Sequence, residues 1–131
     1  MDVTGLVSLK SAYGPKVTMN RLESEIRSRG MIVFAKIDHA AGAEAVGMTL
    51  RPTELVIFGN AKGGTPLMQG VQTMGIDLPL KALVWQDDSG ATILSYNAPK
   101  WLAARHGSGV PSAPLDAMTG ALDAIAKSAT S

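Results

Sequence analysis

The stretch from Leu55 to Gln69, LVIFGNAKGGTPLMQ, constrains the fold of this chain more than any other part of the sequence. An apolar run ends at Gly59, and two adjacent glycines follow at positions 63 and 64. Thr65-Pro66 then supplies the residue types that cap and begin a helix. The pattern predicts a strand, a glycine-rich loop and a helix in direct succession, with Thr65 as the helix cap. Backbone amides at such a junction can face a bound anion.

Apolar periodicity and turn residues predict the remaining elements. Strands are expected at residues 6–10, 31–37, 53–58, 81–86 and 92–96. Helices are expected at residues 15–29, 65–75, 100–106 and 115–131, with short helical turns within 40–47. The last two strands are joined by a hairpin turn at Asp87–Gly90, and no long alternation of parallel βαβ units occurs. The sequence therefore predicts an α+β single domain, with helices on a mixed or mostly antiparallel sheet of about five strands.

The end of the chain is expected to be an added segment. Residues 1–107 form the predicted α+β domain, and residues 108–114 form a flexible, proline-bearing connector. In residues 115–131, apolar side chains recur at helical spacing on one face. This amphipathic helix is expected to dock on the core or on a partner subunit.

Charge and composition exclude several classes of protein. Twelve basic and eleven acidic residues give a net charge of +1 without clusters, so nucleic-acid binding is not predicted. No cysteine is present, which excludes disulfides and cysteine-ligated metal. No basic leader or long apolar run is present, so we expect a cytoplasmic protein that does not bind membranes. Charged residues make up only 18% of the chain, which leaves apolar surface to be buried in a larger core or in a subunit interface. A homodimer is therefore expected, since symmetric pairs are the commonest assemblies.

The glycine-rich loop is the first candidate binding site. It lacks the lysine followed by Ser or Thr at the helix start that a nucleotide P-loop needs, so nucleotide hydrolysis is not favoured. A small anion or carboxylate could still be held by Asn60, by Lys62, by the Gly63 and Gly64 amides and by the Thr65 hydroxyl. The alternative is that the two glycines only make a tight turn and that Thr65 only caps the helix.

Asp38-His39, at the end of the second predicted strand, is the second candidate. A histidine oriented by a carboxylate can act as a general base or bind a metal. His106 is the one other histidine, and it precedes Gly107 at a predicted helix end, where a cation is favoured. An adjacent Asp-His pair has no metal-site spacing, so neither a metal nor a cofactor is predicted. The alternative is that Asp38 or His39 caps the alanine-rich turn that follows.

Three segments together resemble one family. They are IDHAAGA at residues 37–43, LRPTELVIFGNAKGGTPLMQ at residues 50–69, and the stretch from IDLPLKALVWQDDSG to SYNAPKWLAARHG at residues 76–107. These segments resemble the Domain of Unknown Function 302 family, over about residues 7–107. The resemblance implies a small α+β domain that pairs as a homodimer, and it implies no particular chemistry. Residues beyond Gly107 lie outside it.

The sequence thus leads to one main hypothesis and two alternatives. The main hypothesis is a domain that binds a small anionic molecule at the glycine loop, with Asp38-His39 nearby. The first alternative is a homodimeric structural or interaction module without a ligand. The second is a metal- or haem-binding protein. No reaction is predicted.

Overall fold

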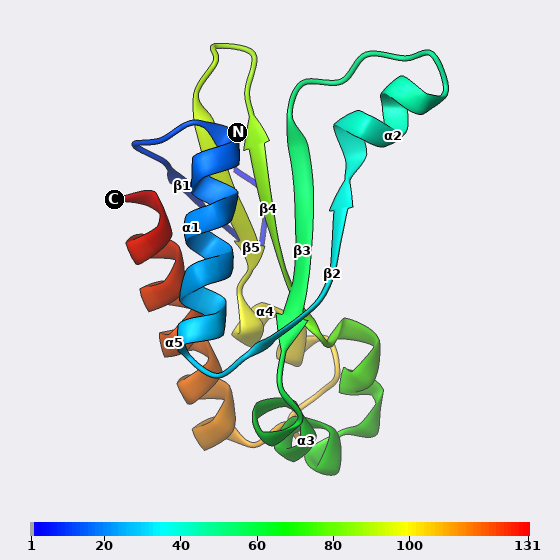
Figure 1. Ribbon diagram of the computed structural model, residues 1–131. Coiled ribbons are helices and arrows are strands. Elements are labelled where there is room, and N and C mark those ends of the chain that lie inside the picture. The colour runs from blue at the N-terminus through cyan, green and yellow to red at the C-terminus, as the bar shows by residue number, and fades with distance from the viewer. Residues whose placement is uncertain (1) are drawn as a thin grey trace.

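The computed structural model describes residues 2–131 and has the α+β architecture expected from the sequence (Figure 1). The strands are β1 (Leu6–Lys10), β2 (Ile32–Asp38), β3 (Thr53–Gly59), β4 (Leu80–Gln86) and β5 (Thr92–Asn97). The helices are α1 (Pro15–Ser28), α2 (His39–Ala45), α3 (Ala61–Gly70), the 3₁₀ helix η1 (Gln72–Asp77), α4 (Pro99–Ala104) and α5 (Ser112–Thr130).

The strands form one sheet in the order β1-β5-β4-β3-β2, and every neighbouring pair is antiparallel. The β4–β5 hairpin turns where the sequence predicts it. The Asp87 carboxylate accepts hydrogen bonds from the backbone amides of Ser89 (3.0 Å) and Ala91 (2.9 Å). Gly90 has a φ of +89°, a conformation that glycine adopts without steric cost. The turn therefore fixes the register of β4 and β5.

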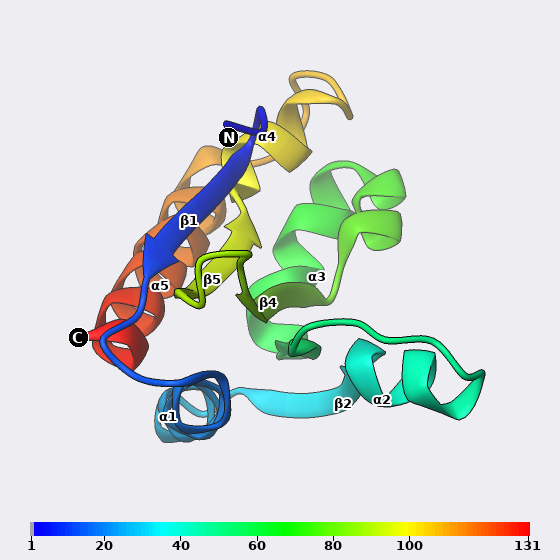
Figure 2. The same ribbon diagram turned by 90° about the horizontal axis from the view of Figure 1, so that it is seen from above.

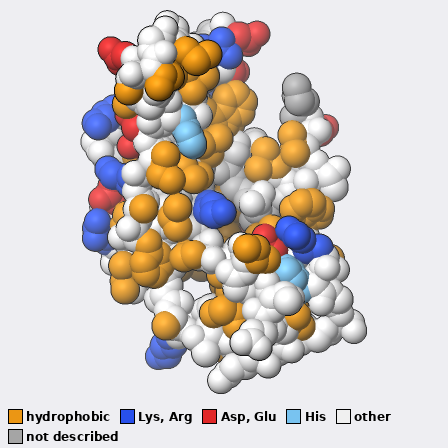
Figure 3. All heavy atoms as spheres, turned by 90° about the vertical axis from the view of Figure 1, so that its right-hand side faces the viewer, with side chains coloured by type: hydrophobic (Ala, Val, Ile, Leu, Met, Phe, Trp, Pro, Cys, Tyr) orange, Lys and Arg blue, Asp and Glu red, His pale blue; other side chains and the backbone are white. Residues whose placement is uncertain are grey.

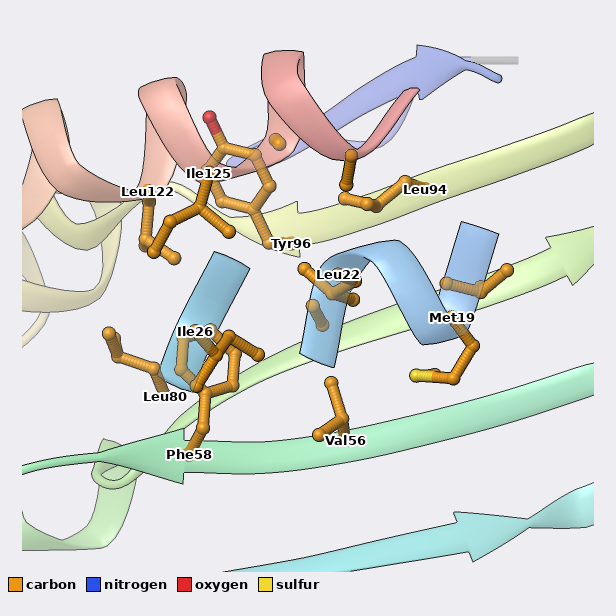
Figure 4. Packing of buried hydrophobic residues seen from close by; sticks show 14 residues of the cluster. Met19, Leu22, Ile26, Val56, Phe58, Leu80, Leu94, Tyr96, Leu122 and Ile125 are labelled. Carbon is orange, nitrogen blue, oxygen red and sulfur yellow. The ribbon is translucent and has the colours of Figure 1, made fainter. Parts of the chain in front are cut away.

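Helices α1 and α5 cover one face of the sheet (Figures 1 and 2). The core lies between these helices and the strands, and Figure 4 shows its side chains pointing toward one another. Its members include Met19, Leu22 and Ile26 of α1, Val56, Phe58, Leu80, Leu94 and Tyr96 of the sheet, and Leu122 and Ile125 of α5. The amphipathic C-terminal helix thus packs its apolar face on its own chain. It begins at Ser112, earlier than the predicted residue 115.

The opposite face of the sheet remains open. Side chains alternate between the two faces of a strand, so Leu55, Leu83 and Trp85 point away from the core and are only half-buried. Helices α2 and α3 lie beyond opposite ends of the strands and not across this face (Figure 1). The sheet therefore has one face covered by helices and one apolar face without a helical layer.

Strand β2 forms one edge of the sheet. Its pairing with β3 is interrupted by a bulge between Val33 and Ala35. Phe34, the extra residue of the bulge, is 54% exposed. Lys36, which interrupts the apolar run in the sequence, lies 3.0 Å from Glu23 of α1 and so ties the edge strand to the helical layer. Within residues 2–131, no helix combines the length and apolarity needed to cross a membrane.

Candidate functional site

An open cavity of about 500 Å³ lies beside the start of α3. Its walls come from the edge strand β2, from α3, from the segment between η1 and β4, and from the first half of α5. Most of the lining is apolar: Met31, Phe34, Met68, Leu78, Leu80 and Met118 contribute the largest side chains. A volume of this size suits a small organic molecule.

The predicted loop residues Asn60, Lys62, Gly63, Gly64 and Thr65 form the polar part of this cavity. Among its described lining residues, Lys62 has the one ionisable side chain. Lys62 and Thr65 are exposed and Asn60 is half-buried, so the polar groups lie at the mouth. The structure therefore brings five of the seven predicted site residues to one concave surface.

The local structure of this loop differs from the prediction, because α3 begins at Ala61 and not at Thr65. Asn60 is the N-cap: its side-chain oxygen accepts a hydrogen bond from the Gly63 amide at 2.6 Å. Neither Gly63 nor Gly64 has a positive φ, so both belong to the first helical turn rather than to a tight loop. The strong asparagine cap outweighs the low helix propensity of the two glycines.

Helix α3 consequently contains Pro66 in its interior. Proline has no amide hydrogen, so the carbonyl of Lys62 lacks its usual partner four residues later. At the start of the helix, the amides of Ala61 and Lys62 have no carbonyl four residues earlier within the helix to accept their hydrogens. The start of α3 thus presents both amide donors and the Lys62 side chain beside the cavity mouth, where negative charge is favoured.

Asp38 and His39 lie elsewhere. Asp38 pairs with Glu54 in the β2–β3 ladder, whereas Gly59, next to the cavity, pairs with Ile32 at the other end of the same strands. The Asp38 carboxylate accepts the Ala41 amide at 2.9 Å and caps α2. Because antiparallel strands rise about 3.4 Å per residue, Asp38-His39 and the glycine loop are at opposite ends of the sheet. The expected proximity of the two is wrong.

His106 belongs to a cluster that sequence reasoning missed. Its Nε2 lies 2.6 Å from Asp77 Oδ2, and its Nδ1 lies 2.9 Å from Thr73 Oγ1. Arg105 contacts the other oxygen of Asp77 at 3.4 Å. Only 7% of the His106 side chain is exposed. The cluster joins η1 to the end of α4, and nothing in the local sequence connects residues so far apart in the chain.

The structure does not gather metal ligands. Within the described residues, no three side chains of the His, Asp, Glu or Cys type lie close enough together to hold an ion. Figure 3 shows the two histidines well separated on the surface it views. Met68 and Met118 are half-buried, and they pack against the buried hydrophobic clusters as well as lining the cavity.

Comparison with known proteins defines the family. The family described as "Domain of unknown function DUF302" matches residues 7–125. This chain belongs to the DUF302 family. The match continues through most of α5, beyond the expected limit at Gly107. The C-terminal helix is therefore part of the DUF302 domain and not an extension of this chain.

Curated proteins from Brucella contain a stretch similar to this DUF302 domain. A protein named fluoride-specific ion channel FluC 1 from Brucella suis biovar 1 (strain 1330) is 48% identical over 109 residues, 83% of this chain and 43% of that protein. Fluoride-specific ion channel FluC 2 from Brucella melitensis biotype 1 (strain ATCC 23456 / CCUG 17765 / NCTC 10094 / 16M) has the same identity over 40% of its length. The domain thus spans about two fifths of these curated relatives.

A crystal structure of an uncharacterized conserved DUF302 protein from Bacillus stearothermophilus has the same fold. It superposes with a TM-score of 0.88 and covers 97% of this chain and 99% of that chain, at 17% sequence identity. At this identity the likeness concerns the fold alone. It extends over the C-terminal helix as well as the sheet.

Proposed function

We propose that this DUF302 domain binds a small organic anion in the cavity beside α3. The observation that carries the proposal is an open cavity of about 500 Å³ with a lysine at its mouth. Among the described residues that line the cavity, Lys62 alone has an ionisable side chain. The start of α3 adds backbone amides to the same side of the cavity. A ligand with one negative group would find a cation and donors there, and no carboxylate to repel it.

The experiment is native mass spectrometry of the protein purified from cells, with two variants. Ala121 is a half-buried residue of α5 that lines the cavity, so Ala121→Phe fills the space. Ala104 is exposed on α4, and Ala104→Phe serves as the control. We expect a bound organic acid on the wild type and on Ala104→Phe, and its loss from Ala121→Phe. The same adducts, or none, on all three proteins would contradict the proposal.

Fluoride is not the ligand that we propose, despite the names of the Brucella proteins. Those names describe proteins more than twice as long as the matched stretch. Fluoride is strongly hydrated, and an apolar cavity offers little to replace its water. A domain of this kind would act beside a channel as a binding module. Fluoride added to the native mass spectrometry sample should therefore leave the organic adduct in place.

The open face of the sheet favours a second candidate, self-association. A compact monomer of 13.6 kDa exposes about 6,600 Å², whereas this chain exposes 7360 Å². The excess is close to the roughly 800 Å² that one partner buries in a standard interface. Figure 3, which views the right-hand side of Figure 1, shows hydrophobic side chains exposed on this side of the molecule, with some Lys and Arg side chains among them. We infer that a second copy of this chain covers this face.

Apolar residues beyond the sheet extend this surface. The segment between α2 and β3 exposes Val46 (72%), Met48 (67%) and Leu50 (47%), and α2 has no buried residue. Light scattering coupled to size exclusion tests the interface with Leu83→Lys on the open face and Val17→Lys on α1 as the control, since Val17 is also exposed (48%). We expect a dimer for the wild type and Val17→Lys, and a monomer for Leu83→Lys. A monomeric wild type would refute self-association.

A further inference from the structure

We propose that the ligand of the cavity is amphipathic, with a flexible aliphatic body and a single anionic head group. This inference rests on the proposed function and adds the chemical class of the ligand. Its basis is the separation of polar and apolar groups within one cavity. The polar side chains Asn60, Lys62 and Thr65 lie on one side at the mouth, whereas the deeper lining, including Leu78 and Leu80, is aliphatic.

The shape of one wall favours an extended chain. Pro114, Ala117, Met118 and Ala121 all line the cavity from α5, and their spacing of three to four residues places them in one row along the helix. At 1.5 Å per residue this row is about 10 Å long. Three of the four side chains, those of Pro114, Ala117 and Ala121, are short, and this low row along the helix is called the trough. An extended chain can lie in such a trough over its whole length.

Three methionines contribute to the walls of the cavity. Met31 directly precedes β2, Met68 comes from α3 and Met118 from α5. Thioether side chains are unbranched and flexible, and they adapt to apolar ligands of variable conformation. Phe34 is the one aromatic side chain of the described lining, and it is 54% exposed at the edge strand. The deep lining therefore lacks the stacked rings that would select a planar aromatic compound.

The polar side of the cavity determines the charge of the head group that it can bind. In the described lining no Asp, Glu or Arg is present, and Lys62 supplies the one charge. An exposed ion pair is worth up to about 1 kcal/mol, which corresponds to about fivefold in affinity. The aliphatic body contributes more, because each CH₂ group buried adds about 0.8 kcal/mol, or about fourfold. Affinity should therefore depend on chain length first and on the head group second.

Isothermal titration calorimetry with straight-chain carboxylates tests the ligand class. The series runs from acetate through hexanoate and octanoate to decanoate, with decanol, inorganic phosphate and sodium fluoride as comparison ligands. We expect affinity to increase about fourfold for each CH₂ that the cavity accommodates. Decanol should bind about fivefold more weakly than decanoate to the wild type. Lys62→Ala should remove that difference, whereas Lys16→Ala, an exposed lysine of α1, should leave it.

Three further variants connect decanoate binding to the cavity. Ala121→Phe should abolish decanoate binding, and Ala104→Phe should not. Ala117 is exposed on the same row, so Ala117→Leu narrows the trough without disturbing the core, and it should weaken decanoate more than hexanoate. It also replaces Ala121→Phe if that variant does not fold.

The outcomes separate the two proposals. If phosphate or acetate binds as tightly as decanoate and Ala121→Phe abolishes this binding, the cavity is an anion site and the amphipathic class is wrong. If affinity rises with chain length but Ala121→Phe changes nothing, binding occurs elsewhere and both proposals fail. If no compound of the series binds, the amphipathic class is refuted, and the native mass spectrometry experiment decides the proposed function alone.

Discussion

His106 Nε2 lies 2.6 Å from Asp77 Oδ2, and this contact joins η1 to the end of α4. We expect Asp77→Asn to destabilise the protein by roughly 1–3 kcal/mol, because one largely buried hydrogen bond to the imidazole loses its charged acceptor. The control is Asp116→Asn, since Asp116 pairs with Lys100 while 63% of its side chain is exposed. That variant should cost less than about 1 kcal/mol. Urea unfolding measures the stability of both variants. Equal losses of stability would show that the contact with His106 contributes no more than an exposed ion pair.

Glu23 and Lys36 predict a dependence of stability on pH. The Lys36 hydrogen bond, followed by that of Arg27, holds the pKa of Glu23 below its ordinary value of 4.5. The hydrogen bond to Glu23 raises the pKa of Lys36 above its ordinary 10.5. The stabilisation from Glu23 is therefore present above pH 4.5 and is lost as the pH falls through its lower folded pKa. The stabilisation from Lys36 is present below pH 10.5 and is lost at still higher pH.

The corresponding variant is Glu23→Gln. Both side chains retain contact with water, so solvent screening limits the expected loss to about 0.5 kcal/mol near neutral pH. In acid well below 4.5, the variant and the wild type should unfold at the same urea concentration. A difference that persisted in acid would show that Glu23 acts through packing and not through its charge.

Two glycines within helices should respond oppositely to alanine. A Cβ at Gly70, the end of α3, would lie 2.6 Å from the Gly109 carbonyl oxygen and 2.5 Å from Pro111 Cδ. At Gly120 of α5 a Cβ would meet nothing within 4 Å. We expect Gly70→Ala to destabilise by roughly 1–3 kcal/mol and Gly120→Ala to stabilise by about 0.5–1 kcal/mol. Thermal unfolding of both variants checks the pair, and a neutral Gly70→Ala would mean that residues 109–111 move freely.

Asn60 is predicted to stabilise α3 by capping it. Asn60→Ala removes the acceptor of the Gly63 amide and should cost about 1 kcal/mol, whereas Asn60→Asp retains an acceptor and should cost less. The aspartate would also place a negative charge beside Lys62, so the same variant should weaken binding of an anion. Chemical unfolding and ligand titration together measure the two effects. Equal stability of the alanine and aspartate variants would show that the stabilisation by Asn60 does not come from capping α3.

Local patterns predicted the strands well, because alternation and turn residues act over a few positions. The five strands begin and end within one residue of their expected limits, and the Asp87–Gly90 turn is where its residue types place it. The start of α3 was predicted wrongly because Thr65-Pro66 has the residue types of a helix start, whereas Asn60 supplies the actual cap. Several nearby residues can cap a helix, and only the backbone conformation of the folded chain shows which of them does so.

Contacts between distant residues were not accessible to sequence reasoning. Asp38-His39 and the glycine loop flank neighbouring strands, but the antiparallel pairing places them at opposite ends. The His106–Asp77 contact depends on how η1 and α4 meet. Only the polar residues of the candidate site were predicted from the sequence. Its apolar lining, which includes Met31, Phe34 and Met118, comes from segments that are far apart in the sequence and are brought together only by the fold.

Helix α5 is continuous from Ser112 to Thr130, and it serves two regions. Its second half contributes Leu122, Ile125 and Ala126 to the core, and its first half forms the trough of the cavity. If the two halves open as one cooperative unit, amide hydrogens along the trough exchange with solvent only when the core itself opens. A bound molecule would then slow exchange as far as the C-terminal turn, which lies well outside the cavity.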